Sequence, residues 1–118
     1  MGLQIMLEHK EKSLVVHLFG ELDHHYAIEI REKIDVEIFS SNVDKLIFDF
    51  SNVSFMDSSG IGVIMGRYKM MQARGGCVVL AAVNQNVEKL MSVSGLRKII
   101  PEFHTLDEAL TYAGGKTE

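Results

Sequence analysis

The chain has 118 residues, of which 47% are hydrophobic and 24% are charged, a composition typical of a globular protein. Its formal net charge of −4, without any run of Lys and Arg, argues against a surface that binds nucleic acid or anionic lipid. The single cysteine, Cys77, excludes an internal disulfide and a cysteine-based metal site. No apolar stretch is long enough to cross a bilayer, and the first residues lack the pattern of a signal peptide. We therefore expect a cytoplasmic protein that binds neither nucleic acid nor membrane.

The first forty residues predict two strands and a helix. Residues 3–7 alternate between apolar and other side chains, as in a half-buried strand, and residues 14–19 form a second strand after a polar turn. Residues 20–23 break this pattern. Residues 27–38 then repeat apolar side chains at helical spacing, and Asp23 is the predicted N-cap of this helix.

The middle of the chain predicts a strand, a loop and a long amphipathic helix. Residues 45–50 are apolar and rich in strand formers, and we expect residues 51–56 to form a loop with apolar anchors. Helical spacing of apolar residues begins near Ser58 and ends at the two glycines 75–76, which are typical of a helix C-terminus. The apolar run that starts at Cys77 then predicts a buried strand.

The last third of the chain predicts two more helices around a brief edge strand. Residues 84–86 cap a short helix that Gly95 ends, and residues 99–100 are the predicted edge strand. Residues 105–108 have the spacing of a capping box, which opens a final helix. A polar tail follows from about residue 114.

This order of elements predicts an α/β fold. Two antiparallel strands followed by strand–helix crossovers imply a mixed sheet of four to five strands covered by about four helices. We expect residues 1–118 to form one domain, because a chain of this length buries a sufficient core. Sites in such sheets usually form beyond the carboxyl ends of the parallel strands, and Asp57 and Ser58 lie at such a place.

The segment Met-Asp-Ser-Ser-Gly-Ile-Gly at this position carries the main candidate chemistry. Ser58 and Ser59 lie at a predicted helix N-terminus, where unpaired N–H groups and the helix dipole favour an oxygen or an anion. A serine at such a place is either a helix cap or a phosphorylation site that acts as a switch. Asp57 before the serines, and the small residues Gly60 and Gly62 after them, are consistent with an exposed turn that a partner can reach.

Four other kinds of chemistry match the sequence poorly. The glycines at 60–66 lie too far past the strand for a dinucleotide loop, and Gly60 and Gly62 instead keep one helical face bare so that another group can pack closely. The serines lack the G-x-S-x-G elbow of a hydrolase. His24 and His25 are neighbours, whose side chains on a helix diverge by about 100° and do not converge on a metal. Asp49 lacks the acidic cluster of a phosphate-accepting aspartate, so we expect it to face a helix edge or water.

The chain resembles the bacterial anti-sigma factor antagonists of the STAS family along essentially its whole length. The resemblance is carried by Gly-Glu-Leu-Asp at 20–23, by the strand 46–50 and by residues 55–62, of which D-S-S-G-I-G is the most specific part. Asp-His-His at 23–25 is similar to the branch that serves sporulation. The alternatives are an antagonist in a general-stress sigma pathway and, from another class, a nucleotide-binding STAS-like module.

The resemblance implies a regulatory protein with no catalytic activity, metal or cofactor of its own, and nothing requires more than a monomer when it is free. Its unphosphorylated form would bind a protein that is both an anti-sigma factor and an ATP-dependent serine kinase, and so release the sigma factor. Phosphorylation by that kinase would end the interaction, and a serine phosphatase would reverse it. The phosphoacceptor maps onto Ser58. The implied partner surface consists of Glu21, Asp23, Asp57, Ser58, Ser59, Gly60 and Gly62.

Overall fold

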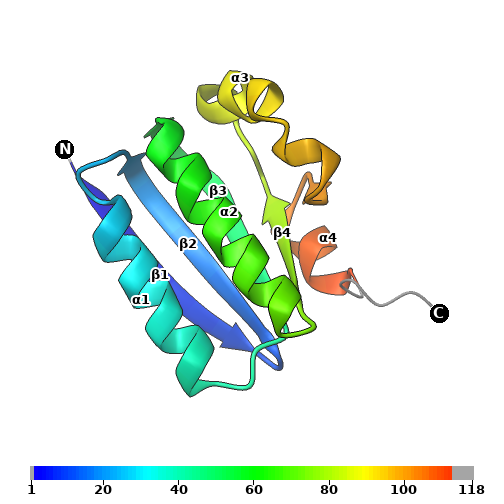
Figure 1. Cartoon of the computed structure of the whole chain (residues 1–118). Coiled ribbons are helices and arrows are strands. Elements are labelled where there is room, and N and C mark those ends of the chain that lie inside the picture. The colour runs from blue at the N-terminus through cyan, green and yellow to red at the C-terminus, as the bar shows by residue number, and fades with distance from the viewer. Residues whose placement is uncertain (1, 113–118) are drawn as a thin grey trace.

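Five strands form one mixed sheet, in the order β1-β2-β3-β4-β5, in the computed structural model, which describes residues 2–112. Strand β1 is antiparallel to β2, whereas β3, β4 and β5 continue the sheet in parallel (Figure 1). The strands are β1 (Leu3–Lys10), β2 (Ser13–Leu22), β3 (Lys45–Met56), β4 (Cys77–Ala81) and β5 (Glu102–Phe103). The helices are α1 (Ala27–Ser40), α2 (Ser58–Ala73), α3 (Gln85–Ser94) and α4 (Leu106–Thr111), with a short 3₁₀ helix at Leu96–Lys98. The predicted α/β class with a mixed sheet is thereby confirmed.

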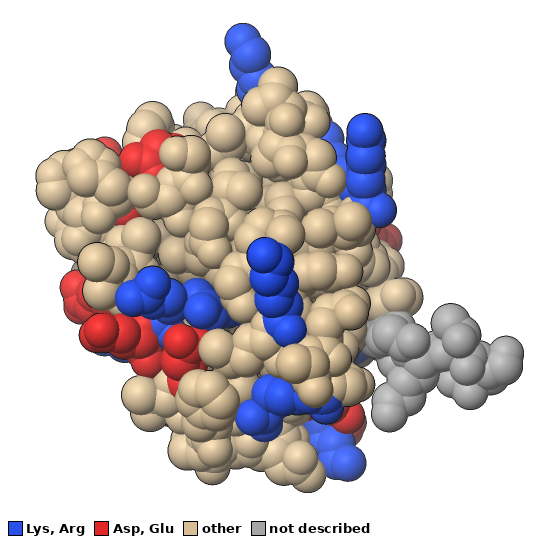
Figure 2. Space-filling model, in the orientation of Figure 1, with Lys and Arg blue, Asp and Glu red and all other residues tan. Residues whose placement is uncertain are grey.

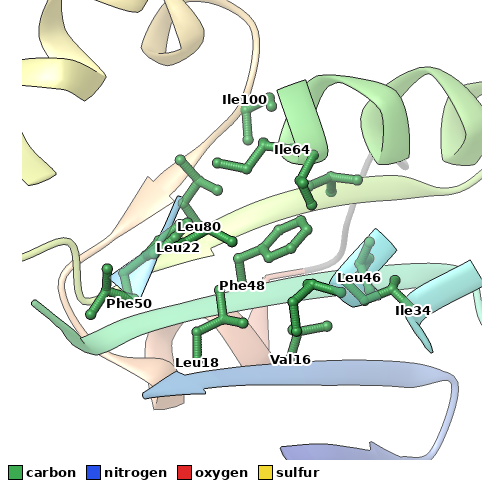
Figure 3. Close-up of a cluster of buried hydrophobic side chains, with 14 of the residues drawn as sticks. Val16, Leu18, Leu22, Ile34, Leu46, Phe48, Phe50, Ile64, Leu80 and Ile100 are labelled. Carbon is green, nitrogen blue, oxygen red and sulfur yellow. The ribbon is translucent and has the colours of Figure 1, made fainter. Parts of the chain in front are cut away.

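Two layers of apolar side chains hold the helices against the sheet. Helices α1, α2 and α3 cover one face, where Phe48 and Phe50 of β3 lie fully buried among side chains from α1 and α2 (Figure 3). Alternate residues of a strand point to opposite faces, so Ile47 instead enters a smaller core under α4. Burial on both faces explains why residues 46–48, which point alternately to the two faces, are all apolar.

Helix α4 is held in place by a buried lysine at the start of β3. The Nζ of Lys45 donates hydrogen bonds to the carbonyl oxygens of Ala109 and Leu110, at 3.1 and 3.0 Å. These carbonyls lie near the C-terminus of α4, where a cation is favourable. The predicted polar tail from about residue 114 lies outside the described residues.

Strands β2 and β3 are longer than the sequence predicts. The predicted break at residues 20–23 is wrong, because β2 runs to Leu22, and the predicted loop at residues 51–56 is the second half of β3. The two strands stay paired to the register Leu22–Met56, across register shifts that follow His17 and Gly20. This pairing satisfies backbone groups in segments whose polar composition is typical of loops.

Helix α1 begins at Ala27, where the helical spacing of apolar residues starts, but Asp23 is not its N-cap. Tyr26 occupies the capping position without a side-chain cap. The N–H groups of Tyr26 and Ala27 donate to the carbonyl oxygen of Asp23, each at 3.1 Å, so one turn of chain separates β2 from the helix. The Asp23 carboxylate accepts the N–H of His25 within that turn, at 3.0 Å.

The predicted caps of the later helices are confirmed, but the predicted edge strand is misplaced. The side chain of Asn84 accepts the N–H of Asn86 at 2.9 Å, and Thr105 accepts the N–H of Glu108 at 3.1 Å. Residues 99–100 form no strand. Ile100 is instead buried in the core, and the edge strand follows it as β5. Cys77 does begin a strand but is half-buried.

A buried histidine links the first three strands. The Nδ1 of His17 in β2 lies 2.7 Å from Oδ2 of Asp49 in β3, and its Nε2 lies 2.9 Å from Oε1 of Glu8 in β1. The prediction that Asp49 faces a helix edge or water is therefore wrong, since only 8% of that residue is exposed. Burial works against the charged ring, but the hydrogen bonds to Glu8 and Asp49 prevail and raise the pKa of His17.

This arrangement predicts a pH-dependent part of the protein's stability. Because the pKa of His17 is raised above its ordinary value of 6.5, the folded state binds this proton more tightly than the unfolded state does. The resulting stabilisation is fully present below pH 6.5 and is lost as the pH rises through the folded pKa. We expect the free energy of unfolding in urea to fall over this range in the wild type, and to fall less in His17→Gln. Equal slopes in the two proteins would contradict a protonated His17.

Candidate functional site

The candidate site lies at the end of the sheet where β3 passes into α2 and β2 passes into the turn before α1 (Figure 1). The N–H of Asp57 donates to the carbonyl oxygen of Leu22 at 3.3 Å, which joins the ends of the two strands. This contact brings residues 23–25 beside residues 57–59, although more than 30 positions separate them in the sequence. The site therefore combines two chain segments at the carboxyl ends of parallel strands.

Asp57, and not a serine, is the N-cap of α2. Its backbone is extended, with φ −110° and ψ −171°, and its Oδ1 accepts the N–H of Ser59 at 2.8 Å. Ser58 is the first residue of the helix, and its side chain is exposed. Of the two interpretations that the sequence leaves open for this hydroxyl, the helix cap is contradicted, because the aspartate before it takes that role.

The second oxygen of Asp57 binds the turn before α1. Its Oδ2 accepts the main-chain N–H of His24 at 3.2 Å and lies 3.4 Å from Nδ1 of the same residue. Partial burial works against ionisation of Asp57, but the hydrogen bonds from Ser59 and His24 prevail and lower its pKa. The carboxylate is therefore charged at neutral pH, and it holds the turn against the helix.

The other two acidic residues of the predicted surface lie on the β2 side of the site. Asp23 follows the end of β2, and its Oδ2 lies 3.5 Å from Nδ1 of His25. Glu21 is a half-buried residue of β2, paired in register with Phe55 of β3. The structure thus brings Asp23 and Asp57 to the same end of the molecule, joined through residues 23–25, which we call the histidine turn.

The two glycines of the predicted surface have different surroundings. Gly60 is buried, and a Cβ there would lie 2.6 Å from Sδ of Met56 and 3.1 Å from Cδ2 of Leu22. Gly62 is exposed, and a Cβ there would meet no atom within 4 Å. The predicted close packing therefore applies to Gly60 alone. Gly62 lies one turn after Ser58 on the same side of the helix and leaves that surface bare.

Sequence reasoning missed two contacts of the site's framework. It rejected His24 as a metal ligand and gave this residue no contact, whereas in the structure His24 binds the carboxylate of Asp57. It recognised Asn84 as a cap, but not that the amide nitrogen of this residue donates to the carbonyl oxygens of Phe50 and Val53, at 3.1 and 3.0 Å. Neither contact has a local signal, because each spans more than 30 residues of sequence.

The described residues show neither a metal site nor a membrane span. Within residues 2–112, no cluster of three or more His, Cys, Asp or Glu side chains is arranged to hold a metal ion. In the same range, none of the helices combines the length and the apolar character that crossing a bilayer requires.

This fold and this site define a STAS domain: the family model described as "STAS domain" matches residues 4–109, and the chain belongs to that family. An anti-sigma F factor antagonist of Paenibacillus polymyxa is 42% identical over 111 residues, which cover 94% of this chain and 95% of the relative. An anti-sigma-B factor antagonist of Bacillus subtilis (strain 168) is 32% identical over 100 residues, which cover 85% of this chain and 90% of the relative. The family predicted from residues 20–23, 46–50 and 55–62 is confirmed.

Solved structures agree with the sequence relatives. The anti-sigma factor antagonist SpoIIAA in its unphosphorylated form matches with a TM-score of 0.80 and 38% identity, over 91% of this chain and 93% of that chain. The Bacillus cell fate determinant SpoIIAA in its phosphorylated form matches with a TM-score of 0.72 and 37% identity, over 91% of this chain and 96% of that chain. The chain is thus similar in fold to SpoIIAA in both its unphosphorylated and its phosphorylated form.

The assignment of the cap predicts unequal effects of substituting two neighbouring residues. Asp57→Ala removes the side chain that accepts the Ser59 N–H, so we expect it to lower the free energy of unfolding by about 0.5–2 kcal/mol. Ser58→Ala removes an exposed hydroxyl and should change that energy by less than about 0.5 kcal/mol. Urea unfolding at neutral pH measures both. Asp57→Asn is the control, since asparagine also caps helices, and a larger loss in Ser58→Ala than in Asp57→Ala would disprove the assignment.

The different surroundings of Gly60 and Gly62 predict that substitution by alanine changes the free energy of unfolding in opposite directions at the two positions. Gly60→Ala places a methyl group against Met56 and Leu22, so we expect a loss of about 1–3 kcal/mol in the free energy of unfolding. Gly62→Ala adds a methyl group in open space and favours the helix by about 0.5–1 kcal/mol, so that variant should be stabilised. Thermal or urea unfolding of the pair measures the difference. Destabilisation by both substitutions would mean that the surroundings of Gly62 are tighter than the structure shows.

Proposed function

We propose that this chain is an anti-sigma factor antagonist whose affinity for its partner is switched by phosphorylation of Ser58. The observation that carries the proposal is the exposed Ser58 side chain, next to the capping Asp57 and at the same end of the molecule as the histidine turn. The identity of 42% to an anti-sigma F factor antagonist over most of both chains supports the same function.

In this proposal the unphosphorylated chain binds an anti-sigma factor that is also a serine kinase. The contact surface is the exposed or half-buried part of the predicted set: Glu21, Asp23, Asp57, Ser58, Ser59 and Gly62. Gly60 contributes in another way, because it is buried and lets α2 approach Met56 and Leu22 closely. Binding at this surface displaces the sigma factor from the kinase.

Phosphorylation then changes the charge of the surface without a need to unfold it. A phosphate adds a charge of about −1.5 to −2 beside the ionised Asp57. The cap of α2 survives, because it depends on the Asp57 carboxylate and not on the modified hydroxyl. The phosphates of the ATP held by the kinase would repel this charge, and like charges at an interface cost several kcal/mol. The switch is therefore electrostatic and local.

The chain acts in this scheme as a substrate and a ligand, and not as an enzyme. ATP is bound by the kinase partner, and a serine phosphatase removes the phosphate, so the antagonist needs no cofactor. We place the protein in the cytoplasm, where sigma factors act. The higher identity to the anti-sigma F factor antagonist than to the anti-sigma-B factor antagonist, 42% against 32%, supports the sporulation pathway over the stress pathway.

The assignment of Ser58 predicts a single phosphorylation that depends on one residue. After incubation with a cognate anti-sigma kinase and ATP, we expect intact-mass measurement to show one added phosphate on the wild type and on Ser59→Ala, and none on Ser58→Ala. Ser58→Ala should still bind the kinase, because its fold and surface charge are unchanged. A phosphate on Ser58→Ala, or none on Ser59→Ala alone, would place the switch on the neighbouring serine. No phosphate on any of the three would refute phosphorylation as the switch.

A further inference from the structure

Two histidines and two aspartates form a continuous row beside Ser58. The Oδ2 of Asp23 lies 3.5 Å from Nδ1 of His25, and Nδ1 of His24 lies 3.4 Å from Oδ2 of Asp57. The two imidazole rings pack between the carboxylates, with centroids 4.2 Å apart and planes inclined by 33°. We call Asp23, His25, His24 and Asp57 the carboxylate–imidazole row.

The ring of His24 is held beside Asp57, the residue before Ser58, by its own main chain. The N–H of His24 donates to Asp57 at 3.2 Å, and this bond does not depend on the ring. The ring nitrogen lies 3.4 Å from the same oxygen, which is longer than a strong charge-assisted hydrogen bond of about 2.7–2.9 Å. The side chain is also 69% exposed. The imidazole is thus tethered beside the residue that precedes Ser58 without being locked onto it.

Other cations near this end of α2 are scarce. Within residues 2–112, the ion pairs of Asp57 involve no basic side chain except His24. The first basic residue of α2 is Arg67, which is buried and paired with Asp35 at 3.0 Å. On the face drawn in Figure 2, the acidic surface near the start of α2 has no Lys or Arg beside it. The basic side chains that contact the carboxylates of this site are therefore the imidazoles of the row.

We propose that the imidazole of His24 is the internal counter-charge of the phosphate on Ser58. The inference rests on the proposed function, because it concerns the phosphorylated form. When Ser58 carries a phosphate, the exposed ring exchanges its long contact with Asp57 for a bond to the more highly charged phosphate. His25 stays at the Asp23 end of the row, and the other groups that face His24 are Asp57 and His25 themselves.

The consequence is a phosphorylated state whose charge depends on pH. A protonated imidazole favours the dianionic phosphate, so the second proton of the phosphate leaves at a lower pH than it would beside Asp57 alone. His24 thereby sets how much negative charge the modified surface presents.

The test uses full-length protein with phosphoserine introduced at position 58 during translation, so that no kinase is needed. The titration of the phosphate is followed by ³¹P NMR in the wild type, in His24→Ala and in His25→Ala. His25 is a matched control, since its side chain is 70% exposed against 69% for His24 and it pairs with Asp23 instead. We expect the midpoint, ordinarily near pH 6, to rise by about half a unit in His24→Ala and to stay at the wild-type value in His25→Ala.

A fourth protein separates the charge of the ring from any structural effect. His24→Arg supplies a permanent cation, and we expect it to restore a midpoint at or below that of the wild type. Equal midpoints in the wild type and His24→Ala, an equal rise in His25→Ala, or no restoration by His24→Arg would each overturn the proposal. Failure of a kinase to modify Ser58 would refute the proposed function, but it would not alter this titration or what the titration shows about His24.

Discussion

The parallel pairing of β2 with β3 is the constraint on which the candidate site depends. The two strands stay in register to Leu22 and Met56, well past the end of β4 at Ala81. Because both strands end at the same edge, the turn after β2 and the first turn of α2 meet there, and the N–H of Asp57 is satisfied by the carbonyl of Leu22. Without this extension the histidine turn and the serines would lie on separate parts of the surface.

The carboxylate of Asp57 binds the two segments that meet at this edge. One carboxylate oxygen caps α2 through Ser59, and the other binds the turn through His24. Because the aspartate supplies the cap, the hydroxyl of Ser58 is left exposed at the first position of α2. A residue that carried both the cap and the modification would disturb the helix whenever it was modified. The separation of these roles between neighbours makes a local electrostatic switch compatible with a stable fold.

The local elements followed from patterns within a few residues. The start of α2, the Asn84 and Thr105 caps and the end of α3 at Gly95 depend on contacts between residues close in sequence, and all were predicted. The errors share a different cause. The second half of β3 looks like a loop because exposed polar residues interrupt the buried Val53 and Met56. Asp49 looks exposed because its partner His17 lies 32 residues away. Long-range pairing leaves no signal in a short window of sequence.

The sequence by itself determined the class of fold, the family and the two serines as the place of interest, because helix periodicity and the D-S-S-G-I-G segment are local properties. Tertiary structure decided which glycine is buried and which histidine reaches Asp57. These outcomes depend on where the ends of β2 and β3 come together, and that juxtaposition is created only when strands distant in the chain pair.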